Sequence, residues 1–237
     1  GSGFAGVGIL EDRAGNDRYR AGPGSQGFGM YGIGILCDLE GADRYEGDLL
    51  VQGAAGPGGA GILCDGEGND AYEAGGRYRD FREEGVHLSM AQGFGRGLRP
   101  LTAGGIGILY DGGGDDHYRA EYFAQGAAHL SGTGMLIDRD GDDRYEARRY
   151  AQGCGTHRAV GVLMEGRGDD RYTLWGVGQG CGHDLSVGIL IDRQGDDRYR
   201  AVLLAQGAGN ANALPLAATE LVRVATEGLI RSEPHLL

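Results

Sequence analysis

The sequence predicts an all-β fold, a parallel β-solenoid (β-helix) of about seven 27-residue coils with three short strands per coil and a C-terminal helical cap. The main observation is a repeat of fixed period, which is the signature of stacked structural units. The unit is clearest from Gly188 to Tyr199 and closes with Gln206-Gly207. Its leucine recurs at Leu10, Leu36, Leu63, Leu109, Leu136, Leu163 and Leu190, its tyrosine at Tyr19, Tyr45, Tyr72, Tyr118, Tyr145, Tyr172 and Tyr199, and its glutamine at Gln26, Gln52, Gln92, Gln125, Gln152, Gln179 and Gln206.

Composition supports a β-solenoid over other repeat classes. The chain has 50 glycines among 237 residues, and a glycine costs about 1 kcal/mol in a helix interior, which argues against a helical solenoid. The glycines do not follow the three-residue period of collagen. Apolar residues make up 41% of the chain and recur in every repeat, which argues against disorder.

Each regular repeat divides into three stretches of nine residues, as in 32–40, 41–49 and 50–58. The first stretch is apolar and β-branched, the second opens with a glycine turn and runs into the tyrosine, and the third carries Gln-Gly. Short strands separated by glycine turns indicate one solenoid coil with three sides. The first four residues resemble the end of an earlier repeat, so we expect the chain to begin in mid-coil and to be a possible fragment.

The predicted organisation is a solenoid over 1–212, an insert over 73–105 in the third coil, and a capping helix and tail over 213–237. The helix is expected from Pro215 to Gly228, because a proline stands in its first turn and apolar residues share one face. Solenoid ends need such caps to cover exposed strand edges. The insert is charged and aromatic, and it is either a surface loop or part of a binding side.

The strand that opens each repeat has apolar side chains at both sets of alternating positions. Val7 and Ile9 point one way and Leu10 points the other. A strand that is buried on one face alternates with polar residues, so both faces of this sheet are expected to be covered. Either the leucine ladder contacts a partner, as self-association or another domain, or the strand twists at its end and hides the leucine.

The acidic turns are the strongest chemical signal. Their stacking would place carboxylates in rows about 5 Å apart, and each neighbouring pair would repel by roughly 3 kcal/mol at an effective dielectric constant of about 20. A counter-charge is therefore required, either Ca²⁺ or the arginines that follow the second acidic column, Arg18, Arg44, Arg144, Arg171 and Arg198. The first acidic column is Asp12, Asp38, Asp65, Asp111, Asp138, Glu165 and Asp192, and the second is Asp17, Asp43, Asp70, Asp116, Asp143, Asp170 and Asp197.

The turn from Asp65 to Tyr72 and the segment from Gly113 to Tyr118 resemble one nonapeptide of the haemolysin-type (RTX) calcium β-roll, Gly-Gly-x-Gly-x-Asp-x-apolar-x. In that family the turn carbonyls and the aspartate ligate Ca²⁺ between successive coils. The resemblance implies that the second acidic column supplies calcium ligands. It covers about a third of each repeat. The family motif recurs every nine residues, whereas here it fills one nine-residue stretch in three and an aspartate replaces the first glycine.

A second constellation follows the glutamines and forms an alternative site. Stacking would place its side chains on one edge of three successive coils. Cysteine and histidine are ligands for Zn²⁺, and a Cys–His pair also suits a nucleophile, although the spacing matches neither signature and surface histidines beside small buried thiols explain it equally. The residues are Cys154, His157, Cys181, His183 and His129.

The remaining columns allow two interpretations each. Cys37 and Cys64 share a column, as Cys154 and Cys181 do, so the thiols are either disulfides within reach of each other or unpaired core residues. The glutamines form either an amide ladder along the stack or a row that binds carbohydrate hydroxyls.

Function follows from these features as three hypotheses. The first is a non-enzymatic repeat scaffold or binding module that binds calcium, located outside the cell or at its surface. The second is a lyase or hydrolase acting on polysaccharide, with its site between the insert residues Glu83, Glu84 and His87 and the tyrosine or glutamine columns. The third is an acidic rod that mimics DNA. The formal charge of −12 argues against binding nucleic acid, and no apolar run reaches the length needed for membrane insertion.

Overall fold

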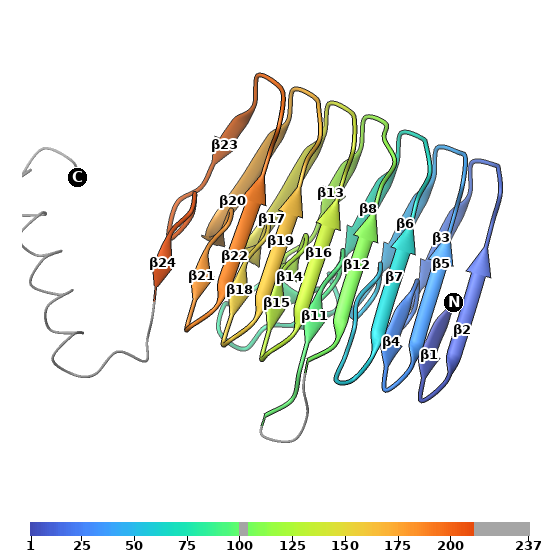
Figure 1. The fold of residues 1–237 in the computed structure, drawn as a ribbon, viewed down its shortest axis with the longest axis horizontal. Coiled ribbons are helices and arrows are strands. Elements are labelled where there is room, and N and C mark those ends of the chain that lie inside the picture. The colour runs from blue at the N-terminus through green and yellow to red at the C-terminus, as the bar shows by residue number, and fades with distance from the viewer. Residues whose placement is uncertain (100–103, 211–237) are drawn as a thin grey trace, which may run out of the picture.

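The computed structural model describes residues 1–99 and 104–210, which fold as an all-β parallel β-solenoid of about eight turns (Figure 1). No helix occurs within those ranges. The C-terminal helix expected from Pro215 to Gly228 lies outside the described residues. The predicted fold class is therefore confirmed for the solenoid.

The strands stack into three faces, and on the third face one turn contributes isolated bridges at Ala55 in place of a strand. The first face consists of β2 (Val7–Glu11), β5 (Ile33–Cys37), β7 (Ala60–Cys64), β12 (Ile106–Tyr110), β16 (Thr133–Ile137), β19 (Val160–Met164) and β22 (Val187–Ile191). The second consists of β3 (Arg18–Ala21), β6 (Arg44–Gly47), β8 (Ala71–Ala74), β13 (His117–Arg119), β17 (Arg144–Ala151), β20 (Arg171–Gly178) and β23 (Arg198–Arg200). The third consists of β1 (Ser2–Phe4), β4 (Phe28–Met30), β11 (Gly95–Arg96), β15 (Ala128–His129), β18 (Gly155–Thr156), β21 (Gly182–His183) and β24 (Gly209–Asn210).

Equivalent positions of successive repeats pair in register. Leu36 pairs with Leu63 and Tyr45 with Tyr72, both in parallel. On the third face, bridges through Ala55 join the strands of the first turns to those of the later ones. Strand β1 precedes the first repeat and pairs with β4, so it belongs to a partial turn that the count of sequence repeats does not include.

Leucine and tyrosine columns form the core between the first and second faces. Leu63, Leu109, Leu136 and Leu163 have no exposed surface, and consecutive tyrosine rings stack with centroids 4.7–4.9 Å apart. Of the two alternatives for the leucine ladder, contact with a partner does not hold for Leu36 to Leu163, because these leucines are buried in the core. The leucines point inward, and the isoleucine and valine positions of the same strands point outward.

The inward glycine of each first-face strand explains why the sequence pattern did not show that the leucines point inward. The inward positions of each first-face strand are a glycine and the leucine, as in Gly34 and Leu36. A Cβ on Gly34 would lie 2.0 Å from the carbonyl oxygen of Phe28 on the third face. The inward glycine thus permits the close approach of two faces, and it removes the alternation of apolar and polar residues that marks a one-sided strand.

The glutamine column closes a corner of every turn. Each glutamine has a positive φ, 55° at Gln125, and so does the glycine after it, 70° at Gly126. The Gln125 Nε2 group donates hydrogen bonds of 3.0 Å to the carbonyl oxygens of Tyr118 and Glu146, one in its own turn and one in the next. The predicted amide ladder between glutamines is therefore wrong, because the amide donors serve backbone carbonyls and the side chains are buried.

The insert over 73–105 adds a hairpin of β9 (Tyr78–Arg79) and β10 (His87–Leu88), and β10 pairs with β14 (Tyr122–Ala124). Arg82 forms an ion pair with the buried carboxylate of Asp80 and lies over the ring of Tyr122. These contacts dock the insert against the aromatic core of the third face.

Substituting Gln125 by alanine should lower the free energy of unfolding by about 2–4 kcal/mol, because two buried carbonyl oxygens lose their donor. Urea denaturation followed by far-UV circular dichroism measures the change. Gln194→Ala is the matched control, since Gln194 is exposed and should have little effect. Equal midpoints for the two variants would contradict the corner role.

Candidate metal centre

The two acidic columns lie inside the solenoid at the turn between the first and second faces. Residues of the first column follow each first-face strand, and residues of the second precede each second-face strand. From Asp38 to Asp170 every member of both columns is at most 3% exposed. The terminal members, Asp12, Asp17, Asp192 and Asp197, are half-buried. The predicted rows of carboxylates are thus present, and they are internal.

Phenol groups supply the first column with hydrogen bonds. The Tyr118 hydroxyl donates to Asp138 Oδ2 at 2.6 Å, and the Tyr72 hydroxyl donates to Asp111 Oδ2 at 2.7 Å. Burial, followed by the nearby carboxylates, raises the pKa of Tyr72 and of Tyr118 well above the usual range. The tyrosines therefore remain protonated donors, and each ties its own turn to the carboxylate of the next.

The second column binds backbone amides between turns. Asp116 Oδ1 accepts a hydrogen bond of 2.6 Å from the Asp70 amide, and Asp143 Oδ1 accepts one of 2.7 Å from the Asp116 amide. The same contact links Asp43 to the Asp17 amide. Hydrogen bonds from amides to carboxylates are stronger than neutral ones, so this column joins successive turns from near Asp17 to Asp197.

Several buried carboxylate oxygens have no hydrogen-bond partner. They are the second oxygen of Asp43, Asp70, Asp116 and Asp143 in the second column, and Oδ1 of Asp38, Asp65 and Asp192 in the first. An unsatisfied buried acceptor costs free energy, and a charged one costs more. The sequence could not reveal these oxygens, because a repeat shows which residues share a column and does not show which atoms form hydrogen bonds.

The carboxylates gather into groups of three. Each group takes one second-column residue from one turn and both columns from the next, and its ligand atoms lie within 4.8 Å of one another. Five such groups are Asp17–Asp38–Asp43, Asp43–Asp65–Asp70, Asp70–Asp111–Asp116, Asp116–Asp138–Asp143 and Asp143–Glu165–Asp170. Second-column members are shared by adjacent groups, so the groups form a continuous row along the solenoid.

Burial and mutual repulsion oppose ionisation of this row. Burial, together with the charges of nearby aspartates, raises the pKa of Asp65 to about 8 and that of Asp70 to about 7. The pKa of Asp43 rises to about 6, again chiefly through burial. At neutral pH the row therefore holds either protons or a bound cation.

Arginine does not neutralise these carboxylates, so the predicted arginine ladder is wrong. Arg18, Arg44, Arg144, Arg171 and Arg198 are all exposed. Arg18 pairs with Glu46, and Arg44 pairs with Glu46 and Glu73, on the outer side of the second face. The cause is strand alternation, because the residue after an inward aspartate points outward.

A third acidic column, Asp115, Asp142, Asp169 and Asp196, remains exposed. Asp115 Oδ1 accepts the amide of Asp142 at 3.0 Å, and Asp142 Oδ1 accepts that of Asp169 at 2.9 Å. These side chains close the turns from the outside. A DNA-mimicking rod would need its acidic rows at the surface, and only this third column meets that need.

The cysteines and the histidines of the alternative site lie in different environments. Cys154 and Cys181 have no exposed surface and belong to the apolar cluster of the third face. The four cysteines of the chain are free thiols, and Cys37 and Cys64 lie side by side in register on the first face.

The histidines of the alternative site form a row of rings. His129 and His157 have ring centroids 5.1 Å apart, and His157 and His183 are 5.9 Å apart. His157 Nδ1 lies 2.8 Å from Asp184 Oδ2. Burial lowers the pKa of His129 to about 3, so its imidazole is neutral. A Zn²⁺ site here stays a prediction.

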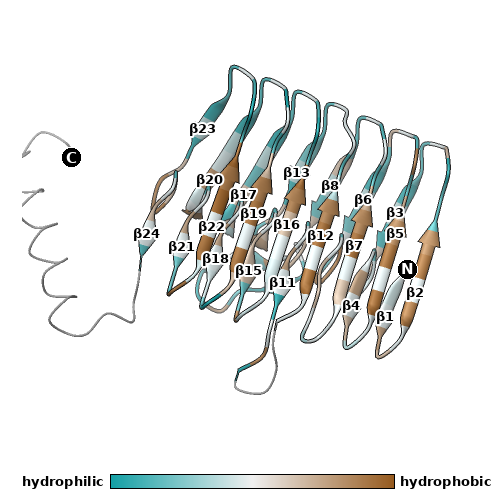
Figure 2. Cartoon of the chain, viewed as in Figure 1, coloured by the Kyte–Doolittle hydropathy of each residue, from teal (hydrophilic) through white to brown (hydrophobic). Residues whose placement is uncertain are grey.

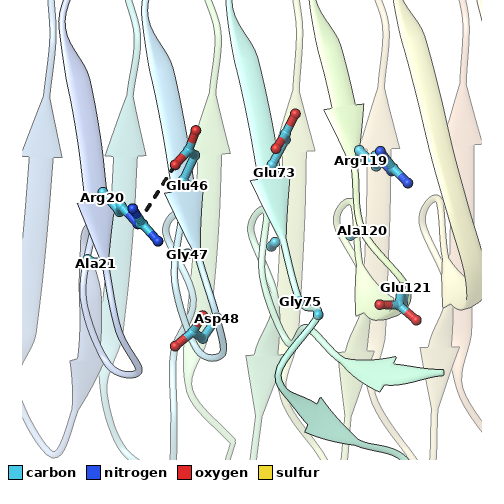
Figure 3. Close-up of a pocket in the computed structure, with 12 residues that line it drawn as sticks. Arg20, Ala21, Glu46, Gly47, Asp48, Glu73, Gly75, Arg119, Ala120 and Glu121 are labelled. Atoms are coloured by element: carbon cyan, nitrogen blue, oxygen red, sulfur yellow. Dashed lines mark ion pairs between the residues drawn. The ribbon is translucent and has the colours of Figure 1, made fainter. Parts of the chain in front are cut away.

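A shallow groove of about 360 Å³ lies on the outer side of the second face (Figure 3). Its floor includes the in-register residues Ala21, Gly47 and Ala74, and Arg20 and Glu46 border it as an ion pair. Side chains of both charges line the groove.

The insert acids expected to do acid–base chemistry lie elsewhere. Glu83 forms an ion pair with Arg148 and accepts a hydrogen bond from the Tyr122 hydroxyl, and Arg148 lowers the pKa of Glu83. His87 pairs with Glu121. The tyrosines and glutamines next to the insert, Tyr72, Gln92, Tyr118 and Gln125, are buried, so they do not form the wall of a groove beside it.

The donor set of the acidic row fits a hard cation. Each group offers only carboxylate oxygens, the ligands that Ca²⁺ prefers, and glycine turns adjoin them. The groups lack the nitrogen and sulfur donors typical of structural zinc sites. The residues that would hold the ions are therefore the first and second acidic columns.

Without a cation, stability should fall as the pH rises from 5 to 8.5. Each raised pKa means that the folded state binds protons more tightly than the unfolded chain, in which aspartates titrate near pH 4. That stabilisation is complete below about pH 4 and is lost as the pH passes the folded pKa values of about 6 for Asp43, 7 for Asp70 and 8 for Asp65. Thermal unfolding in chelator across this range measures it, and a midpoint that rises with pH would contradict it.

None of the described residues forms a helix long and apolar enough to cross a bilayer. Comparison with protein-family models, with curated proteins and with solved structures found no match.

Proposed function

We propose that this protein is a non-enzymatic repeat scaffold whose interior acidic row binds calcium. The observation that carries the proposal is the set of buried carboxylate oxygens without hydrogen-bond partners, repeated turn after turn. A cation would bind oxygens that the fold leaves unsatisfied and would remove the repulsion between carboxylates.

The arrangement suits ions placed between turns. In the group Asp116–Asp138–Asp143, one oxygen of Asp143 accepts an amide and its other oxygen has no partner. The hydrogen bond to one oxygen holds each carboxylate in place, so its unpartnered oxygen is positioned to bind a cation. Ca²⁺ accepts irregular coordination more readily than Mg²⁺, which demands near-octahedral geometry. Calcium is therefore the expected ion, and the resemblance of the turns to RTX repeats agrees with this choice.

The contacts of the recurring residues and of the insert support the scaffold role. The tyrosine, glutamine and acidic columns all bond to neighbouring turns. The insert acid Glu83 is held by Arg148. Calcium would then act as a folding cofactor for a secreted or surface-exposed rod, since calcium is abundant outside cells and a cation that binds only the folded state stabilises it by mass action.

Calcium should raise the thermal midpoint of the protein at pH 8, and chelator should reverse the rise, because ions bind the folded row and not the unfolded chain. Differential scanning calorimetry measures the shift, and isothermal titration calorimetry measures the number of ions bound. Several ions per chain are expected, with magnesium binding more weakly. An unchanged midpoint at millimolar calcium would refute the proposal.

Asp116→Asn should separate the ionic role from the structural one. Asp116 belongs to two groups, and an asparagine can still accept the Asp70 amide. The variant should be more stable than the wild type in chelator, because a buried acid is removed, and it should gain less from calcium. Asp115→Asn is the matched control, since Asp115 is adjacent and exposed. A calcium response equal to that of the wild type in Asp116→Asn would place the ions elsewhere.

A further inference from the structure

A second group of possible metal ligands lies at the corner where the third-face strands β18 and β21 end. Figure 2 shows the first-face strands as apolar over most of their length, whereas β21 is hydrophilic towards its end. Thr156 and His183 are the last residues of the two strands and pair in register. His157 and Asp184 follow them at equivalent positions, and the His157 amide donates to the His183 carbonyl oxygen at 3.0 Å. Polar side chains of two successive turns therefore meet at this corner.

Two imidazoles converge on one carboxylate oxygen here. His157 Nδ1 lies 2.8 Å from Asp184 Oδ2, and His183 Nε2 lies 3.5 Å from the same oxygen. His87 and His117 also contact carboxylates, but each of them faces a separate glutamate. Among the ion pairs between described residues, the convergence of two ring nitrogens on one oxygen is thus particular to this corner.

The separations of these atoms are close to those of ligands around one tetrahedral ion. Zn²⁺ binds imidazole nitrogen and carboxylate oxygen at about 2.0–2.2 Å, so two such ligand atoms lie about 3.3–3.5 Å apart. The 3.5 Å between His183 Nε2 and Asp184 Oδ2 already has this value. The 2.8 Å at His157 is the length of a hydrogen bond, and it would grow by roughly half an ångström when a cation takes the place of the proton.

The surroundings keep the imidazole of His157 in the form that binds metals. Burial lowers the pKa of His157 although Asp184 opposes the shift, so the ring is neutral near pH 7. The side chains of Asp184 and His183 are 11% and 12% exposed, and that of His157 is 32% exposed. The fold therefore holds the ligands and leaves one side open to solvent. Arg99 would repel a cation, but Arg99 is exposed, and water and salt screen such repulsion.

We propose that His157, His183 and Asp184 bind one Zn²⁺ ion, with water in the fourth coordination position. Imidazole and carboxylate suit zinc and other first-row transition metals, whereas calcium takes oxygen ligands. The ion would connect two successive turns of the solenoid. Because the site shares no residue with the acidic row, it does not depend on the calcium proposal.

The proposed ligands are part of the Cys/His site that the sequence predicts. The thiols of Cys154 and Cys181 have no exposed surface and belong to the apolar cluster of the third face. The His129 ring stacks on Phe123 with centroids 5.1 Å apart. We therefore leave these three residues out of the ligand set.

Titration with zinc tests the site. Isothermal titration calorimetry of the untagged protein in millimolar calcium should give one zinc ion bound per chain at micromolar zinc. Co²⁺ in place of zinc should give the visible absorption of a tetrahedral ion. A folded protein that binds no zinc at micromolar concentration would overturn the proposal. Repeating the titration in calcium-free buffer keeps the result separate from the calcium proposal, because zinc should bind equally in both.

Substitution of the ligands tests their identity. His157→Gln, His183→Gln and Asp184→Asn should each weaken zinc binding at least about tenfold, since even outer-shell partners of a metal contribute that much. His87→Gln is the matched control, because His87 Nδ1 makes a similar contact of 2.9 Å with Glu121 but has no second imidazole beside it. The thermal midpoint without zinc verifies that each variant is folded. Unchanged affinity in His157→Gln, or an equal loss in His87→Gln, would place the zinc elsewhere.

Discussion

In-register stacking is the constraint on which the rest of the structure depends. Because each turn pairs with the next at equivalent positions, every residue type in the repeat becomes a row with a spacing near 4.8 Å. A row of leucines packs, and a row of tyrosines stacks its rings within 5° of parallel. A row of glutamines supplies two amide donors at each corner. Stacking favours all three rows and penalises only the rows of acids.

Hydrogen bonds within the fold offset part of the cost of stacking the acids. Phenol hydroxyls and backbone amides each satisfy one oxygen of a carboxylate, and they also tie the turns together. The other oxygen remains buried and without a partner in about half of these residues, among them Asp43, Asp70, Asp116 and Asp143 of the second column. A bound cation would remove this cost, because it would be a partner for the unsatisfied oxygens and would balance the charge of the carboxylates.

The sequence predicted the solenoid, the stacked tyrosines and the two acidic columns, because a period shows directly which residues share a row. It could not show the direction in which a side chain points when both parities are apolar. The pattern left open whether Leu36 faces a partner or is hidden, because its inward neighbour, Gly34, has no side chain to signal burial. The arginine ladder failed for the related reason that Arg44 and Asp43 are adjacent and therefore face opposite sides. The partners of individual oxygens depend on coordinates, and no pattern contains them.

The acidic row lies at the corner between the first and second faces, where a buried position and an exposed one follow each other closely in the chain. The first column begins where the first-face strands end, so Asp65 is held inside by Tyr45 while Glu67, two residues later, is exposed. An ion bound between Asp43, Asp65 and Asp70 would fix the turn that carries Glu67. Because adjacent groups of carboxylates share their second-column members, ions bound in successive groups would order the corner between the first and second faces along the length of the solenoid.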